Sequence, residues 1–229
     1  MSDGPTLSIV MPVLNESTRI VEALEALAAL RRRGTEVIVV DGGSKDGTAD
    51  VAAPLADRVI VSPRGRARQM NAGAVVAQGR MLLFLHADTR LPPDAHTLVE
   101  RTLAAHHWGR FDVTLEGRSA WLRVIAAMMN LRSRLTGIAT GDQAIFVTRA
   151  AFAAVGAYPD QPLMEDIELS KRLTHIGPPA CLRARVTTSG RRWDTQGVWR
   201  TILLMWRLRF DYWRGVPAAE LHAWYYPES

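Results

Sequence analysis

The sequence predicts an α/β protein with a mostly parallel central sheet flanked by helices, in one domain with a C-terminal helical extension. In the first ninety residues, short apolar runs of strand length alternate with longer amphipathic stretches of helix length. Each short run has a continuous apolar centre, which is typical of parallel strands covered on both faces. Of the 229 residues, 48% are hydrophobic, so the chain can bury the core of one such domain.

Four strands are expected in the first half, at 7–13, 36–41, 57–62 and 80–88. Helices are expected between them at 19–33, 48–54 and 66–78. The polar residues that follow these strands are Asn15, Glu16, Asp41, Arg64 and Asp88. Such sheets bind ligands beyond the carboxyl ends of their strands, so these side chains mark the expected site.

The second half is less regular. Strands are expected at 110–117, 142–148 and 180–189, and helices at 120–135, 164–173 and 197–213. We expect residues 1–193 to form the sheet domain. Residues 194–229 are expected to form a helical extension that packs on it or at an interface.

The basic residues are almost all arginine. The chain has 28 basic and 23 acidic residues, a net charge of +5, and only two lysines. Arginine binds phosphate oxygens well, but the abundance of alanine points equally to genomic base composition. No nucleic-acid partner is inferred from this charge.

Cys181 is the only cysteine, which excludes an intrachain disulfide and a thiolate metal cluster. The first residues lack the basic and apolar pattern of a secretory signal. No apolar run reaches the about 18–20 residues that span a bilayer. We therefore expect a cytoplasmic protein, with a peripheral position at the inner face of the membrane as an alternative.

A dinucleotide site is not supported. It requires a glycine-rich turn after the first strand, where this chain has PVLNE. The DGGSKDG segment after the second strand matches neither that spacing nor a Walker loop.

The first two turns provide carboxylates instead. Glu16 and Asp41 could accept hydrogen bonds from a base or a ribose, although Asp41 could equally cap its own turn. Arg64, Arg66 and Arg68 surround the start of the next helix, where a diphosphate would gain helix-dipole and guanidinium contacts. A solvated arginine face is the alternative.

His86 and Asp88 lie at the end of the fourth expected strand, directly after its apolar run Met81–Leu85. A divalent cation that holds a diphosphate needs oxygen ligands, and one carboxylate with phosphate and water is sufficient. On an extended backbone both side chains would face the same side, so His86 could be a second ligand. A core histidine is the alternative.

Glu165 and Asp166 open an expected helix, where acidic residues either complement the helix dipole or supply a general base. Asp142 and Gln143, in GDQAIF, have hydrogen-bonding groups suited to sugar or acceptor hydroxyls.

Four segments in order, IVMPVLNE, VIVVDGGSKDGT, NAGAVVAQGRMLLFLHADT and LMEDIELSKRL, resemble the motifs of family-2 glycosyltransferases of the GT-A fold. The resemblance extends from Leu7 to Trp193. HADT, GDQAIF and RRW are most similar to short bacterial members known as radical-SAM/selenodomain-associated transferases.

The resemblance implies a metal-dependent hexosyltransferase that uses a nucleotide-diphosphate sugar and Mn or Mg. It implies that Asp88 binds the metal, with His86 where the family has aspartate, and that Asp166 is the base beside Glu165. It places the nucleotide sugar at Pro12, Asn15, Glu16, Asp41, Gly42, Arg64, Arg68, Asn71, His86 and Ala87. It places the acceptor at Gly141, Asp142, Gln143, Arg192 and Trp193.

We expect inverting transfer to an acceptor hydroxyl, in which Asp166 removes the proton. Two alternatives stay open. A nucleotidyltransferase would release pyrophosphate, and a catalytically idle sugar-nucleotide-binding module would bind the donor without transfer.

Residues 198–213 form an aromatic stretch that also carries Arg200, Arg207 and Arg209. An amphipathic helix of this kind can lie in a membrane interface, which would suit a lipid-linked acceptor. A core helix or a homodimer contact would show the same stripe.

Overall fold

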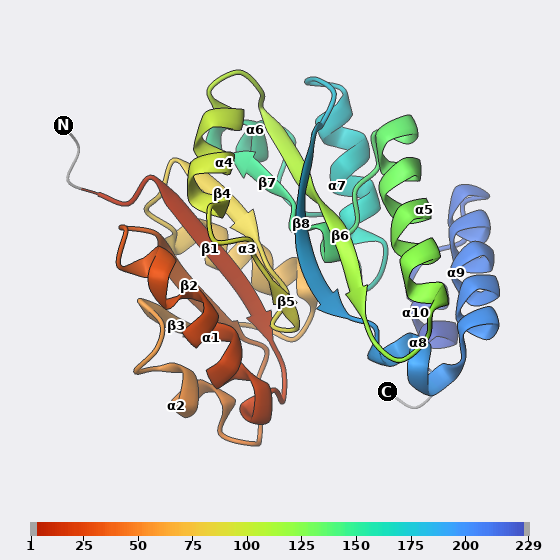
Figure 1. The fold of residues 1–229 in the computed structure, drawn as a ribbon, viewed down its shortest axis with the longest axis horizontal. Helices are drawn as coiled ribbons and strands as arrows, with labels where there is room; N and C mark the ends of the chain where they lie inside the picture. The colour runs from red at the N-terminus through yellow and green to blue at the C-terminus, as the bar shows by residue number, and fades with distance from the viewer. Residues whose placement is uncertain (1–3, 227–229) are drawn as a thin grey trace.

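A curled eight-stranded sheet forms the centre of the computed structural model, which describes residues 4–226 (Figure 1). The strand order is β3-β2-β1-β4-β7-β6-β8-β5. The strands are β1 (Leu7–Val13), β2 (Glu36–Asp41), β3 (Arg58–Val61), β4 (Met81–Phe84), β5 (Thr89–Arg90), β6 (Trp108–Glu116), β7 (Phe146–Thr148) and β8 (Ala180–Ser189).

The first four strands of that order are parallel, as the sequence predicts. β7 runs antiparallel to both β4 and β6, and β8 returns parallel to β6. The short strand β5 pairs antiparallel with β8 at the far edge. The sheet is therefore mixed, with its parallel half at the N-terminal side.

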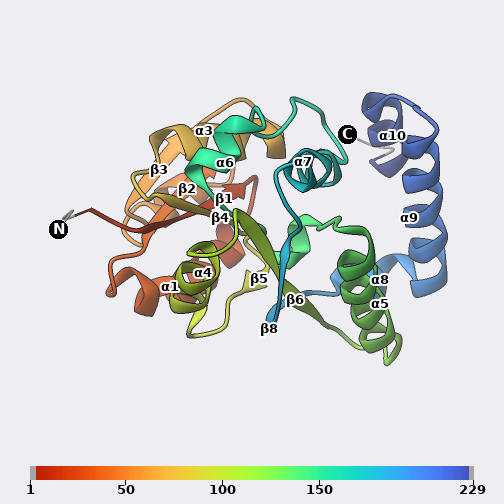
Figure 2. The same cartoon turned by 90° about the horizontal axis from the view of Figure 1, so that it is seen from above.

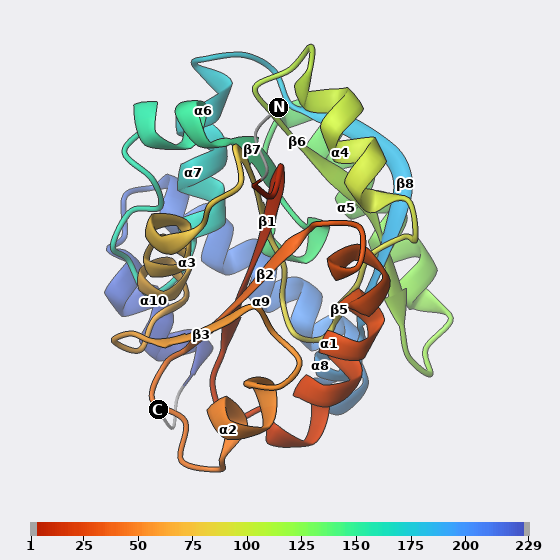
Figure 3. The same cartoon turned by 90° about the vertical axis from the view of Figure 1, so that its left-hand side faces the viewer.

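Helices cover both faces of the sheet (Figure 2). The helices are α1 (Ser17–Arg31), α2 (Thr48–Ala52), α3 (Arg66–Val76), α4 (Ala95–Leu103), α5 (Trp121–Thr136), α6 (Arg149–Ala154), α7 (Glu165–Thr174), α8 (Arg191–Gln196), α9 (Val198–Trp213) and α10 (Ala218–Tyr225). Figure 3 shows α1 and α4 on one side of β1, and α3, α6 and α7 on the other.

Alternation along the strands creates two cores. Ile9 and Met11 of β1 pack with α1 and α4, whereas Val10 packs with α3 and α6. Since successive strand side chains point to opposite faces, an uninterrupted apolar run supplies both layers at once. This is the physical reason why the continuous runs of the sequence predict buried parallel strands.

Two strand predictions need correction. The strand expected at 80–88 ends at Phe84, because its pairing with β1 stops there, and the chain then turns with Thr89 N donating to the carbonyl of His86. The strand expected at 142–148 begins only at Phe146. Gly141–Gln143 form a 3₁₀ turn, closed by reciprocal capping between Thr140 and Gln143.

The C-terminal helices pack on the α7 region through a small apolar cluster of Leu163, Met164, Ile167, Leu208 and Leu221. In Figure 1, α9 lies beside α5 at one end of the molecule, and α10 returns toward the sheet. Within residues 4–226, no helix has both the length and the apolar character needed to cross a bilayer.

Candidate active site

Two adjoining cavities open at the carboxyl edge of the parallel strands, as the strand-end rule predicts. The first has a volume of about 490 Å³ and the second about 550 Å³. Glu16, Arg66, His86, Asp88 and Tyr226 line both. These five side chains border both cavities, so a ligand in the first pocket and a ligand in the second could contact the same residues.

The floor of the first pocket is held by Gln69 of α3. Its amide nitrogen donates to the carbonyls of Val13 and Val40, over 2.8 Å each. These carbonyls lie at the ends of β1 and β2, so one buried side chain ties the two strands together below the cavity.

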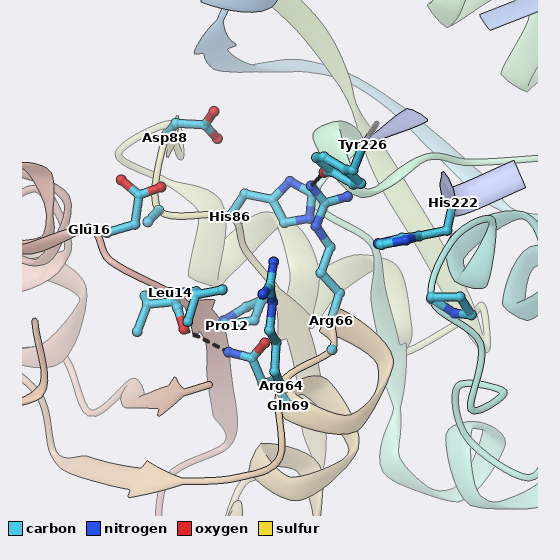
Figure 4. A pocket seen from close by; sticks show the side chains of 14 residues that line it. Pro12, Leu14, Glu16, Arg64, Arg66, Gln69, His86, Asp88, His222 and Tyr226 are labelled. Carbon is cyan, nitrogen blue, oxygen red and sulfur yellow. Dashed lines mark hydrogen bonds between the residues drawn. The ribbon is translucent and has the colours of Figure 1, made fainter. Parts of the chain in front are cut away.

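Arg64 and Arg66 enter the first pocket at the start of α3 (Figure 4). Gly65 between them has a φ of +136°, a conformation that favours glycine. The Arg66 side chain is exposed by its accessible area but stands inside the cavity, where partial loss of water opposes its charge; the Tyr226 hydroxyl and the carboxylates of the second pocket outweigh this and raise the pKa of its guanidinium. Two guanidinium groups beside a helix N-terminus would bind an anion such as a diphosphate.

Arg68 is placed differently from the expectation. It forms an ion pair with Asp160 at 2.7 Å and does not line either pocket. Arg66 and Arg68 are two residues apart on a helix and therefore point about 200° apart. Only the first can face the cavity.

Pro12, Glu16 and Ala87 line the first pocket, together with His86 and Asp88. Asp41 does not, because its buried carboxylate accepts hydrogen bonds from the amides of Gly43 and Ser44 and from the Ser44 hydroxyl. It organises the turn after β2, which is the alternative that the sequence left open.

Three other residues expected at the nucleotide sugar also have structural partners. Asn15 accepts from Lys45 N at 3.0 Å, and Asn71 exchanges hydrogen bonds with the backbone of Tyr158. Gly42 packs against Gln69, whose side chain would lie 3.1 Å from an added Cβ. These residues shape the loops behind the pocket.

His86 and Asp88 lie on a turn, so the extended backbone assumed for them is incorrect. His86 Nδ1 lies 3.5 Å from Asp142 Oδ1. Burial and the positive charge of Arg66 both favour the neutral ring of His86. The hydrogen bond to Asp142 and the negative charges of Asp142 and Asp88 outweigh them, so the pKa of His86 is raised. The imidazole is thus engaged by a carboxylate.

Asp88 keeps its carboxylate on the pocket wall. Its closest hydroxyl donors, Thr89 and Thr188, are distant at 3.4 and 3.5 Å. No three His, Cys, Asp or Glu side chains of residues 4–226 come together to form a metal site by themselves. A cation would fit here only with Asp88 as a protein ligand and with oxygens from the substrate and water completing the shell.

Asp166 faces the second pocket from the start of α7. Gly141 N donates to its Oδ2 at 2.8 Å, which ties the 3₁₀ turn to the helix. Its neighbour Glu165 also lines the pocket but is 4% exposed. Burial, followed by the charge of Asp166, raises the pKa of Glu165 to about 7.

The backbone that presents this pair is strained. Met164, directly before Glu165, has a φ of +64° although it is not glycine. Such a conformation costs about 1–3 kcal/mol and persists only where the surrounding packing enforces it. Here Met164 is buried against α9 and α10, so the C-terminal helices help to set the start of α7.

Most of the residues expected at an acceptor line the second pocket, namely Gly141, Asp142, Arg192 and Trp193. Arg192 stacks on Tyr225, with its guanidinium carbon 3.9 Å from the ring centroid. Gln143 is fully buried and bonds to Thr140 N and Asn130, so it supports the turn from behind.

Sequence reasoning missed the C-terminal contribution. His222 and Tyr226 close the first pocket opposite Glu16 and Asp88 (Figure 4), and Arg66 Nη2 lies 3.3 Å from the Tyr226 hydroxyl. Met205 and Arg209 of α9 line the second pocket. No local motif marks these residues, because their role depends on where the last two helices fold back.

Comparison with known proteins agrees with this architecture. The sequence model described as Glycosyl transferase family 2 matches residues 8–148, more than half of the chain. A PGL/p-HBAD biosynthesis glycosyltransferase of Mycobacterium tuberculosis is 38% identical over 95 residues, which cover 38% of this chain and 37% of that protein.

An undecaprenyl-phosphate 4-deoxy-4-formamido-L-arabinose transferase of Pseudomonas paraeruginosa is 32% identical over 151 residues. That match covers 59% of this chain and 44% of the relative, so the chain spans less than half the length of these curated relatives.

Among solved structures, the mannosyltransferase PcManGT from Pyrobaculum calidifontis, in complex with GDP-Man and Mn²⁺, has a TM-score of 0.67 and 20% identity. The match covers 98% of this chain and 70% of that one, and it supports the GT-A fold. Taken with the match over residues 8–148, the chain belongs to glycosyl transferase family 2.

Proposed function

We propose that this chain moves a sugar from a nucleoside diphosphate sugar in the first pocket to an acceptor hydroxyl in the second. One observation carries the proposal. The two cavities share a wall of Glu16, Arg66, His86 and Asp88, and Asp166 faces the second cavity beside that wall. A donor and an acceptor bound there would meet at one point.

The donor's diphosphate would lie against the start of α3. Arg64 and Arg66 are directed there, and the free amides of the helix N-terminus favour negative charge. The structural neighbour that binds GDP-Man supports a nucleotide sugar as the ligand, and residues 4–226 fold like it.

Asp88 would hold Mn or Mg together with diphosphate oxygens. When bound, the cation supplies positive charge that stabilises the departing diphosphate. The neighbour's Mn²⁺ supports this assignment, and the single carboxylate is consistent with a cation that binds with its substrate.

Asp166 would act as the base. The amides of Gly141 and Ile167 each donate to one carboxylate oxygen, which limits the rotation of the group and leaves a further lone pair on each oxygen for an acceptor proton. The acceptor would attack the anomeric carbon from the face opposite the diphosphate, so the configuration would invert.

The acceptor is proposed to be lipid-linked. The name of the Pseudomonas relative, an undecaprenyl-phosphate transferase, supports this class. The radical-SAM-associated branch of the family remains an expectation from the short motifs HADT, GDQAIF and RRW.

The test is a product analysis. The full chain is incubated with UDP- and GDP-sugars, lipid-linked and soluble acceptors, and Mn or Mg. We expect release of nucleoside diphosphate together with glycosylated acceptor, and loss of both with Asp166→Asn. Release of pyrophosphate would indicate nucleotidyl transfer, and tight donor binding without turnover would indicate an idle binding module.

A further inference from the structure

The helices α5 and α9 expose two apolar stripes at one end of the molecule. On α9, the exposed members are Trp199, Leu203, Trp206, Phe210 and Trp213, with exposed fractions between 54% and 77%. On α5, they are Trp121, Val124, Met128, Leu131 and Leu135, between 48% and 77% exposed. Most other large apolar side chains of residues 4–226 are buried in the cores.

Each stripe occupies one side of its helix. At 100° per residue, the five positions of α9 fall within an arc of about 80°, and those of α5 do the same. A helix side with such a regular apolar stripe usually packs against a hydrophobic core, but these two stripes are exposed to solvent. The two helices therefore have a second apolar side in addition to the one that packs on the protein.

The stripes meet to form one surface. The rings of Trp121 and Trp199, at the N-terminal ends of the two helices, have centroids 5.2 Å apart. Figures 1 and 2 show α5 and α9 side by side at the same end of the molecule. We call the ten side chains of the two stripes the α5/α9 surface.

The charge around this surface has one sign. The sequences of α5 and α9 contain six arginines and a single acid, Asp211, which pairs with Arg207 at 3.5 Å. Arg134 pairs with Asp112 and Arg209 lines the second pocket, so these two do not contribute to the charge of the surface. Arg200 and Arg207 are exposed along one border of the α9 stripe, and Arg123 is exposed on α5. A partner must therefore offer both apolar area and negative charge.

We propose that the α5/α9 surface docks on the interface of a bilayer that contains anionic lipids. Tryptophan is enriched at the headgroup level of membranes, and arginine beside it would contact lipid phosphates. Five of the chain's seven tryptophans are exposed on α5, α9 and α10. A second copy fits less well, because a symmetric contact would bring the like-charged arginine borders together.

The surface has a geometric relation to the second pocket. The opposite side of α9 contributes Thr201, Met205 and Leu208 to that cavity. Only the thickness of α9 would lie between the pocket and the proposed bilayer. A lipid-linked acceptor held in that bilayer would therefore have a short path to the pocket. The docking itself does not depend on the proposed transfer.

Flotation with vesicles tests the docking without a donor or an acceptor. Vesicles of phosphatidylglycerol and phosphatidylcholine in equal parts are compared with vesicles of phosphatidylcholine alone. We expect the full chain to float with the anionic vesicles. A chain that stays wholly in the dense fraction with both would overturn the proposal.

The apolar contribution is tested with Leu203→Ser combined with Trp206→Ser, which leaves the charge of the surface unchanged. Removing two interfacial side chains should weaken partitioning by about tenfold or more. Val75→Ser is the matched control, because Val75 is 81% exposed on α3, away from the surface. Equal binding by the double variant and the control would contradict the proposal.

The charge contribution is tested with Arg200→Glu, which should weaken binding to anionic vesicles at least fivefold. Quenching of tryptophan fluorescence by brominated acyl chains gives a readout on the folded wild type. Light scattering, which measures the oligomeric state, tests the other possible occupant of the surface, a second copy of the chain. If the double variant turns a dimer into a monomer while vesicle binding is unchanged, the surface is a dimer interface and the proposal fails.

Discussion

The amide of Gly141 donates a hydrogen bond to Oδ2 of Asp166 over 2.8 Å, joining two segments 25 residues apart. The same glycine packs against His86, whose Cε1 would lie 2.6 Å from an added Cβ. The residue thus connects the turn after β4 with the start of α7. The proposed base is positioned by a backbone that only a small residue allows.

Asp166→Asn is expected to lower the rate of transfer about 10²–10⁴-fold, because an amide cannot accept the acceptor's proton. The Asn oxygen can accept from only one of the two amides that now donate to the carboxylate, those of Gly141 and Ile167, so a modest loss of stability is expected beside the loss of activity. Steady-state kinetics and thermal unfolding measure the two effects. Wild-type turnover by this variant would contradict the assignment of the base.

Gly141→Ala should lower both activity and stability. The new methyl group would overlap the His86 ring, which cannot move freely because Asp142 holds it. Overpacking of this kind costs about 1–3 kcal/mol of unfolding free energy. In the control, Gly177→Ala, the added Cβ meets only His107, at 3.8 Å. Equal kinetics and melting temperatures for the two variants would refute the steric argument.

Glu165 should make stability depend on pH. Its pKa rises from 4.5 to about 7 on folding, first through burial and then through Asp166. Between these values the folded chain holds a proton that the unfolded chain has lost, so the free energy of unfolding falls as pH rises. The full effect is about 3 kcal/mol and is reached above pH 7.

Glu165→Gln removes this charge. We expect the variant to be more stable than the wild type at pH 8, by about 1–3 kcal/mol, and similar to it near pH 4. Denaturant unfolding across this range is the measurement. Glu25→Gln, on the exposed side of α1, is the control and should leave the pH profile unchanged.

Arg66→Ala should weaken binding of a nucleoside diphosphate about tenfold or more, because a guanidinium contact with phosphate contributes roughly 1.5–3 kcal/mol. Arg68→Ala removes the same side chain two residues away, where it pairs with Asp160 outside the pockets. Calorimetric titration of both variants with UDP and GDP decides the matter. A larger loss with Arg68→Ala would show that the diphosphate lies elsewhere.

Asp88→Asn should remove the response of donor binding to Mn or Mg. With the wild type, we expect added metal to raise the melting temperature in the presence of donor, and chelation to reverse the effect. Asp50→Asn changes an exposed carboxylate on α2 and should respond as the wild type does. Metal dependence that survives in Asp88→Asn would exclude Asp88 as the ligand.

The sequence by itself predicted the parallel half of the fold, since short apolar runs such as 9–13 and 37–40 are best buried between two helical layers. It also predicted where the candidate site lies, because the ends of those strands meet at one edge. Both inferences depend on periodicity and order, which are local properties of the chain.

The tertiary structure alone decided which side chains face the pockets. Arg66 rather than Arg68 enters, Asp41 closes its own turn, and His222 of the last helix and Tyr226 directly after it reach the first pocket. The outward stripes of α5 and α9 have the same pattern as a core-facing side and differ only in what covers them. The direction of a side chain is set by the segments that pack around it, and these are distant in the sequence.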